Sequence, residues 1–421
     1  MSTPSLLNIP YLYKAGTLYS QIPESGAGDF TVQRTTSPAG FTNRSTRINK
    51  DGLIELVNDN IPRLDYPLGG AVNGCPALLV EPSAQNLTLN SEVISGTPTG
   101  ASIDANVAVS PDGATTADKL KEDSSLGNHN LAGIVGGSLG GTVDSSAYRI
   151  SIFAKADGRN QFTFFDNNQT GAGAGFSTFN LSNGTATGTG VIQNYGNGWY
   201  RCVISCAKTS TTSANALIRL LDAGGNQSYQ GNGTSGILFW GKQLETGSVA
   251  TSYIPTTTAA VTRSEEIVQR QSVPFLIGQT EGTFYFEGEA DFAGSDLPMI
   301  NRSSQNSVLF TKNSTNRLIG YVYYGGTFFT FTTTNPITGP FKAAIAYKTG
   351  NTAFYVNGSQ VGTTNTTSWA FTAPLTEVVA RSSFWIGGLK PYKVRALGVY
   401  PNRIPNTAAP GVLSLATLTA P

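Results

Sequence analysis

Three carboxylates alternate along one short segment, Glu287-Gly-Glu-Ala-Asp291. On a β-strand, alternate residues share a face and lie about 7 Å apart, a separation that suits the acid/base pair of a glycosidase. The same alternation is expected of a solvated strand face opposite the apolar Phe284, Phe286 and Phe292. We favour the solvated face, and we therefore predict no catalytic residue and no enzyme, with a polysaccharide-cleaving glycoside hydrolase as an alternative.

Metal and thiol chemistry has few residues to work with, because the chain contains one histidine and three cysteines. Cys202 and Cys206 are four residues apart, which on a strand is about 13 Å and too far for a disulfide. We expect both to be buried thiols that pack as small apolar groups. His129 is the only imidazole, and we expect it to be an ordinary polar residue. We predict no metal site and no cofactor.

Two loop segments carry residue types found in ligand-binding loops. Asp166-Asn-Asn168 offers oxygens to calcium but lacks the six or more ligands of a full loop. Gly171-Ala-Gly-Ala-Gly175 is glycine-rich, but no Lys-Ser/Thr pair or helix pattern follows it, as a phosphate-binding loop would require. Both segments are predicted to be turns.

Exposed aromatic rings are the candidates for a binding site, because sugars stack on their faces while polar neighbours bind the hydroxyl groups. Trp199 and Trp240 lie in alternating apolar segments, so we expect them to pack inside the β-sandwich to which these segments belong rather than to line a ligand cleft. Tyr323 leads into a Gly-Gly turn, which favours exposure. The predicted ligand-binding residues are Tyr195, Tyr229, Tyr323, Tyr324 and Trp369.

Composition indicates what kind of scaffold holds these residues. The chain has 421 residues, 27 Lys and Arg against 26 Asp and Glu, 48 glycines and only 13% charged residues. A net charge of +1 provides no field to attract nucleic acid or anionic lipid, and no segment approaches the roughly 18 apolar residues of a membrane span. The N-terminus lacks a basic start followed by an apolar run, so we expect no signal peptide and folding in a bacterial cytoplasm.

The pattern of apolar residues predicts an all-β fold: an extended N-terminal anchoring module at 1–91, then two β-sandwich, jelly-roll-like domains at 92–263 and 264–421. Residues 92–263 contain clearly alternating segments such as Tyr148-Arg-Ile-Ser-Ile-Phe-Ala-Lys155, joined by Gly/Asn turns. Residues 256–263 are interpreted as a linker, and 264–271 is the one place where a short helix is considered.

The N-terminal segment resembles a module of bacteriophage virion proteins, mainly head fibres and tail fibres. The residues that carry the resemblance are Arg34, Thr46-Arg-Ile-Asn49, Asp51-Gly-Leu-Ile-Glu55, Pro62-Arg-Leu-Asp-Tyr66, Cys75-Pro-Ala-Leu-Leu-Val-Glu-Pro82, Gln85-Asn-Leu87 and Asn90-Ser-Glu92. The segment departs from the pattern by an irregular insertion at Thr35–Asn43 and by the absence of an aromatic residue after Asn90-Ser-Glu92.

Two further stretches resemble known β-sandwiches. Asp112-Gly-Ala-Thr-Thr-Ala-Asp-Lys-Leu120 and Gly196-Asn-Gly-Trp-Tyr-Arg-Cys202 are similar to a carbohydrate-binding-module-like jelly roll of the same phage proteins. The jelly-roll likeness ends in Phe239-Trp-Gly-Lys-Gln-Leu-Glu245, Thr251-Ser-Tyr-Ile-Pro-Thr256 and Val261-Thr-Arg263. Residues 342–358 and Val394-Arg-Ala-Leu-Gly-Val-Tyr400 are weakly similar to laminin-G or concanavalin-like domains.

These resemblances imply a structural virion protein of a crassvirus-like phage: a capsid head fibre or decoration subunit whose sandwiches project outward and adhere to glycans in host attachment. A tail receptor-binding fibre that recognises host polysaccharide is the alternative. The implied partners are other virion proteins such as the capsid protein, host glycans and further copies of the chain, with no nucleic acid and no membrane insertion.

A homotrimer is expected, with a dimer as the main alternative, because the N-terminal arm carries apolar stretches at 53–56 and 78–80 that need a partner surface. We also expect residues 1–92 not to form an independent domain, because they have too little self-contained apolar surface to offset the entropy of ordering.

Overall fold

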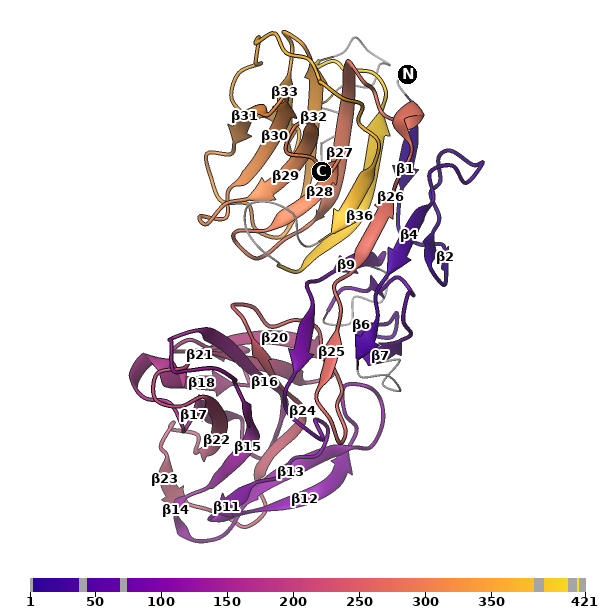
Figure 1. Cartoon of the computed structure of the whole chain (residues 1–421). Coiled ribbons are helices and arrows are strands. Elements are labelled where there is room, and N and C mark those ends of the chain that lie inside the picture. Colours follow the sequence, from indigo (N-terminus) through magenta and orange to yellow (C-terminus); the bar gives the residue numbers. More distant parts are fainter. Residues whose placement is uncertain (1–2, 38–43, 69–73, 382–389, 408–414, 416–421) are drawn as a thin grey trace.

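The computed structural model describes residues 3–37, 44–68, 74–381, 390–407 and 415. Nearly all its regular elements are strands, which form two β-sandwiches joined by extended segments (Figure 1). The predicted all-β fold with two sandwiches is confirmed. Among the described residues, no helix is both long enough and apolar enough to span a bilayer.

The first sandwich consists of two six-stranded antiparallel sheets whose facing side chains form one apolar core. One sheet has the strand order β11 (Thr97–Thr99), β15 (Asn130–Ser138), β22 (Ser213–Leu221), β17 (Gln161–Asp166), β18 (Ser177–Asn180) and β19 (Thr185–Ala186). The other has the order β12 (Ala101–Ala108), β13 (Ala117–Glu122), β24 (Gly236–Thr246), β16 (Ala147–Asp157), β21 (Trp199–Ala207) and β20 (Val191–Gly196).

The expected alternation in this sandwich is confirmed, because Tyr148, Ile150 and Ile152 of β16 all point into the core. Trp199 and Trp240 are also buried, but the predicted location inside the sandwich is wrong, because both lie on the other face of the same sheet. They pack with Phe153 and Tyr253 in a smaller cluster against the N-terminal segment.

The second sandwich has a larger pair of sheets. An eight-stranded sheet has the order β34 (Ser359–Gln360), β33 (Ala353–Val356), β32 (Pro340–Lys348), β27 (Glu281–Glu289), β36 (Tyr392–Tyr400), β9 (Ala77–Val80) and β8 (Leu64–Asp65), with β1 (Leu6–Asn8) also paired to β36. A nine-stranded sheet has the order β2 (Tyr13–Lys14), β3 (Thr17–Leu18), β4 (Phe30–Gln33), β26 (Ile267–Arg270), β35 (Val378–Arg381), β28 (Asp296–Ile300), β29 (Ser307–Lys312), β30 (Leu318–Tyr324) and β31 (Thr327–Thr332).

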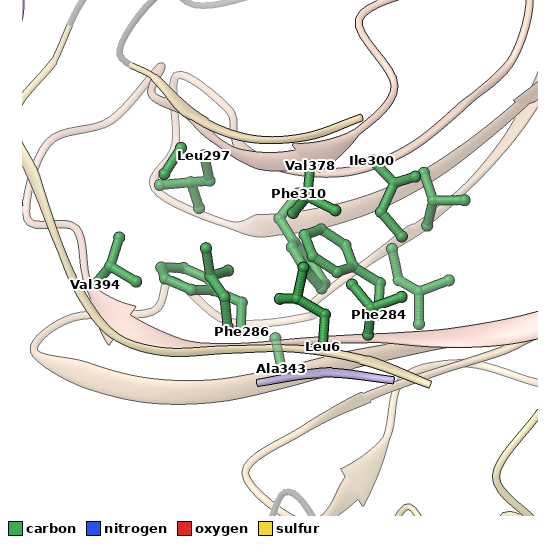
Figure 2. Packing of buried hydrophobic residues seen from close by; sticks show 14 of the residues in the cluster. Leu6, Phe284, Phe286, Leu297, Ile300, Phe310, Ala343, Val378 and Val394 are labelled. Atoms are coloured by element: carbon green, nitrogen blue, oxygen red, sulfur yellow. The ribbon is translucent and has the colours of Figure 1, made fainter. Parts of the chain in front are cut away.

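The N-terminal segment supplies strands to both sheets of the second sandwich. Leu6 packs against Phe284, Phe286 and Phe310 in the core of that sandwich (Figure 2). The expectation that apolar residues 78–80 need a partner subunit is wrong, because all three side chains are buried within the chain. In residues 53–56 the same correction applies to Ile54, which is buried, whereas Leu56 is exposed.

The short helix considered at 264–271 is also wrong. Residues 267–270 form β26, which pairs with β4 on one side and β35 on the other, and Val268 is buried between the sheets. The linker interpreted at 256–263 ends in a strand, β25 (Val261–Arg263), which pairs with β10 (Ala84–Asn86). Pairing with a strand on each side outweighs the weak local preference of this segment for a helix.

Candidate functional site

Five buried charged side chains form a joint where the N-terminal segment meets the chain between the two sandwiches. We name this group, Arg34, Arg63, Glu81, Arg263 and Glu266, the charged joint. Arg63 donates to Glu266 Oε1 and to Glu81 Oε2, each at 2.7 Å. Arg263 Nη1 lies 2.9 Å from Glu81 Oε2, and Arg34 Nη1 lies 3.3 Å from Glu266 Oε1. All five side chains are fully or almost fully buried.

Electrostatics within the joint keep the Glu81 carboxylate ionised. Burial alone would raise the pKa of Glu81, but Arg263 and Arg63 outweigh it and lower the pKa to about 2. The backbone N–H and the hydroxyl of Ser252 also donate to this carboxylate, at 2.8 and 2.7 Å. Four donors on one carboxylate couple the N-terminal segment to the end of the first sandwich.

Two further residues of the N-terminal motif have the same coupling role. Asn86 donates to the carbonyl oxygens of Ile254 and Lys242 and accepts from the N–H of Leu244. The hydroxyl of Ser91 lies 2.6 Å from that of Tyr253. The residues that carry the resemblance to virion proteins therefore include the buried polar contacts that hold this part of the fold together.

A cleft of about 290 Å³ lies beside the charged joint and is lined by the N-terminal segment and both sandwiches. Tyr195 on β20 enters the cleft half-buried, with its ring edge-on to Phe153 at 4.8 Å. Gln193 on the same strand and Asp291 just after β27 are exposed in the lining. The cleft thus offers one aromatic surface with amide and carboxylate groups beside it.

Ion pairs form part of the wall of the cleft. Lys393 Nζ lies 2.7 Å from Asp65 Oδ2, and Arg395 Nη2 lies 3.9 Å from Glu289 Oε2. Burial alone would lower the pKa of Lys393, but Asp65 outweighs it and raises the pKa above its ordinary value. Cationic donors and anionic acceptors can bind the hydroxyl groups of a sugar, and an aromatic ring can stack on its apolar face.

The three alternating carboxylates, Glu287, Glu289 and Asp291, do not all lie at the cleft. Glu289 and Asp291 line the cleft, whereas Glu287 is not among the described residues that line it. Glu287 instead accepts a hydrogen bond from the hydroxyl of Tyr285 at 3.1 Å. The three carboxylates therefore do not converge on one place.

Of the five predicted ligand-binding residues, Tyr195 is the one that lines the cleft. Tyr229 is only 7% exposed, contrary to the exposure expected for a sugar-stacking ring. Its hydroxyl donates to Glu122 at 2.8 Å, and the guanidinium of Arg159 lies 4.7 Å from its ring centroid. It belongs to the packing at one end of the first sandwich, because the ring centroid of His129 also lies 4.5 Å from that of Tyr229.

The other three predicted residues lie in the second sandwich. Trp369 is 7% exposed and packs on Phe371 with ring centroids 4.9 Å apart, so its expected exposure is wrong. Tyr324 is half-buried against the same core, 5.9 Å from Trp369. Tyr323 is half-buried on the opposite face of β30, stacked on Tyr321 at 5.7 Å.

The cysteines and Asp166, which were also considered from the sequence, have contacts that stabilise the fold. Cys202 and Cys206 are buried as predicted, and burial raises the pKa of Cys206 to about 12. Asp166 accepts from the hydroxyl of Tyr148 at 2.6 Å and from two backbone N–H groups. Within the described parts of the chain, no cluster of three or more His, Cys, Asp or Glu is placed to hold a metal ion.

Sequence reasoning missed Gln193, Lys393 and Arg395. Each is an ordinary polar residue on an alternating strand, and nothing in its local sequence distinguishes it from a solvated position. The cleft brings them together from strands that are about 200 residues apart in the chain.

Comparison with known proteins provides likenesses in architecture. No protein-family model matches the chain, and no curated protein sequence matches it. Among solved structures, the CBM40 domain of the Ruminococcus gnavus IT-sialidase bound to α2,3 sialyllactose has 12% identity and a TM-score of 0.26, over 32% of this chain and 86% of that one. Domains LG4-5 of the mouse laminin α1 chain have 12% identity and a TM-score of 0.21, over 75% and 100%.

The tandem CBM22-1-CBM22-2 domain of Paenibacillus barcinonensis Xyn10C has 10% identity and a TM-score of 0.24, over 76% of this chain and 98% of that one. Both kinds of domain named by the sequence resemblance, carbohydrate-binding modules and laminin G domains, are therefore among the similar structures. With TM-scores below 0.5, none of these likenesses identifies a function for this chain.

Proposed function

We propose that this chain is a non-enzymatic structural subunit of a bacteriophage virion, a head fibre or decoration subunit, that adheres to glycan through the cleft. The observation that carries the glycan-binding part is the half-buried ring of Tyr195 beside the exposed Gln193 and Asp291. The N-terminal resemblance supports the virion part. The charged joint fits a rigid projecting subunit, because its buried ion pairs resist relative motion of the segments that they connect.

Attachment to the particle is proposed at the exposed apolar turn near the N-terminus. Ile9, Tyr11 and Leu12 are each about half exposed although they are close together in the sequence. Clustered exposed apolar groups mark protein contact surfaces. The partner in this proposal is a capsid protein, and the subunit is assembled in the cytoplasm of the host bacterium.

The glycan-binding part is tested on a glycan array with the full chain. Tyr195→Ala together with Asp291→Ala is expected to abolish the binding seen with the parent chain, whereas Tyr11→Ala, a matched exposed tyrosine outside the cleft, keeps it. Thermal melting confirms that each variant is folded. Equal binding by the cleft variant and the parent would refute the cleft as the site.

The virion part is tested separately by mass spectrometry and electron cryo-microscopy of purified particles. The chain is expected on the head, and replacement of Ile9, Tyr11 and Leu12 by serine is expected to remove it from particles while glycan binding persists. Absence of the parent chain from particles would refute a virion role, and a position on the tail would favour the receptor-binding fibre. Release of product from capsule polysaccharide that is lost in Glu287→Gln or Glu289→Gln would refute the non-enzymatic assignment.

A further inference from the structure

Strand β31 is the last strand at one end of the nine-stranded sheet. Among the described residues it pairs with β30 alone, through six consecutive residue pairs and without a register shift. Immediately beyond the strand, the N–H of Thr333 donates to the carbonyl of Leu318 at 3.0 Å. This bond sets the phase of the ladder, because hydrogen-bonded and non-hydrogen-bonded pairs alternate along antiparallel strands.

The phase shows which backbone groups of β31 face away from β30. Thr327, Phe329 and Phe331 occupy hydrogen-bonded positions opposite β30, two residues apart from Thr333 and from one another. Phe328, Thr330 and Thr332 therefore direct their N–H and C=O groups outward from the sheet edge. A row of such groups is a template for another strand.

This edge lacks the charges, prolines and bulges with which sheet proteins block strand addition. Residues 318–341 contain no charged residue, and β31 contains neither a proline nor a bulge. Other edge strands are protected: β11 contains Pro98, while β12 and β20 each have a register shift against their neighbour. At six residues, β31 is also long enough to pair along its length, whereas β34 has two.

The outer face of the sheet continues this uncharged surface. Phe328 is 52% exposed, and its ring contacts that of the half-buried Tyr321 at 5.8 Å. Beneath the tyrosine lie Met299 and Leu309, both buried. A strand added at the edge would extend an apolar face that already exists.

We propose that β31 pairs with β31 of a second copy of this chain, antiparallel and about a two-fold axis, so that one sheet continues through both subunits. Full overlap of the three outward positions places Thr330 opposite the partner's Thr330, and Phe328 opposite the partner's Thr332. Pairing about a two-fold axis brings Thr330 next to its own copy, where a charge would repel its counterpart. It also places an uncharged segment of 24 residues against the same segment of the partner. Opposed threonines are favourable cross-strand neighbours.

The pairing does not depend on the proposed function, because it uses neither the cleft nor the N-terminal turn. It replaces the trimer expected from the sequence with a two-fold dimer. The apolar residues 78–80 and Ile54, which motivated the trimer, are buried in their own chain.

The test is the mass of the full chain by size-exclusion chromatography with light scattering at micromolar concentration. The parent chain is expected at twice its mass of 44.2 kDa. Thr330→Lys places two ammonium groups against each other and is expected to weaken the dimer by more than about a hundredfold. Ser359→Lys, which adds the same charge on the exposed edge strand β34, is expected to remain dimeric.

Each contrary result overturns the proposal: a monomeric or trimeric parent chain, a Thr330→Lys variant that stays dimeric, or a Ser359→Lys variant that dissociates. If Thr330→Lys does not melt like the parent, Thr330→Cys in a Cys75→Ser background takes its place. Oxidation is then expected to link the two copies through this position, and failure to form the link under conditions where the parent is dimeric also refutes the pairing.

Discussion

Replacing Glu81 by glutamine removes the charge on which Arg63 and Arg263 converge. The isosteric amide removes the ion pair of Arg263, leaves Arg63 paired with Glu266 alone, and turns N–H donors toward other donors. Breaking a buried ion pair from one side costs about 3–5 kcal/mol. The pKa leads to a similar figure, because a shift from the ordinary 4.5 to about 2 corresponds to about 3 kcal/mol. We therefore expect Glu81→Gln to lower the free energy of unfolding by about 3–5 kcal/mol at pH 7.

Urea unfolding of the full chain measures this loss, and calorimetry reports whether the sandwiches still unfold together. Since the joint couples the N-terminal segment to the first sandwich, the two sandwiches of the variant are expected to unfold in separate steps. Glu55→Gln is the matched control on the same segment. Its ion pair with Arg47 is 3.2 Å long and the Glu55 side chain is 41% exposed, so a loss of about 0–1 kcal/mol is expected.

The pH dependence of unfolding provides an independent check that ionised Glu81 stabilises the fold. A carboxyl group whose pKa is lowered by folding stabilises the fold fully above about pH 4.5, and this contribution is lost as the pH falls toward 2. The difference between the parent chain and Glu81→Gln should therefore shrink across that window. Burial raises the pKa of Glu245, so this group, which is present in both chains, acts in the opposite direction. A difference below 1 kcal/mol at pH 7, or one that does not depend on pH between 4.5 and 2, would refute the reasoning.

Three further predictions follow from burial. Trp240→Ala should cost about 3–5 kcal/mol in urea unfolding, because the side chain is buried and its Nε1–H donates to Thr116 Oγ1 at 3.1 Å; normal stability would show that the cluster can refill the space. Iodoacetamide at pH 8 should label Cys75 alone in the native chain and all three cysteines in urea, since Cys75 is exposed and the other two thiols are buried. Mass spectrometry of the labelled chain identifies the modified cysteines. Residues 1–92 expressed alone should show no cooperative melt by circular dichroism, because strands β1, β8 and β9 lack the sheet that they complete; a sharp transition would contradict this.

Local patterning was sufficient to predict the fold class and much of the packing. Alternation in residues 148–152 places Tyr148, Ile150 and Ile152 in the core of the first sandwich, because a strand with period two must bury one face. Trp199 and Trp240 are instead covered by the N-terminal segment, on the face that points away from this core. The four-residue spacing of Cys202 and Cys206 likewise excludes a bond between them on a strand. Each of these inferences uses residues a few positions apart.

Tertiary structure decided what lies next to what. Residues 267–270 form a strand because β4 and β35 flank them, although β4 is more than 230 positions away in the chain. Tyr229 and Trp369 look like exposed aromatics until neighbours from distant strands cover them, whereas Tyr195 reaches a cleft built by three separate segments. Period two in a sequence shows which residues share a face of a strand, but hydrogen bonds between backbones are the same for any sequence. The choice of neighbouring strand is therefore made by the packing of whole sheets, and with it the position of every site that lies between them.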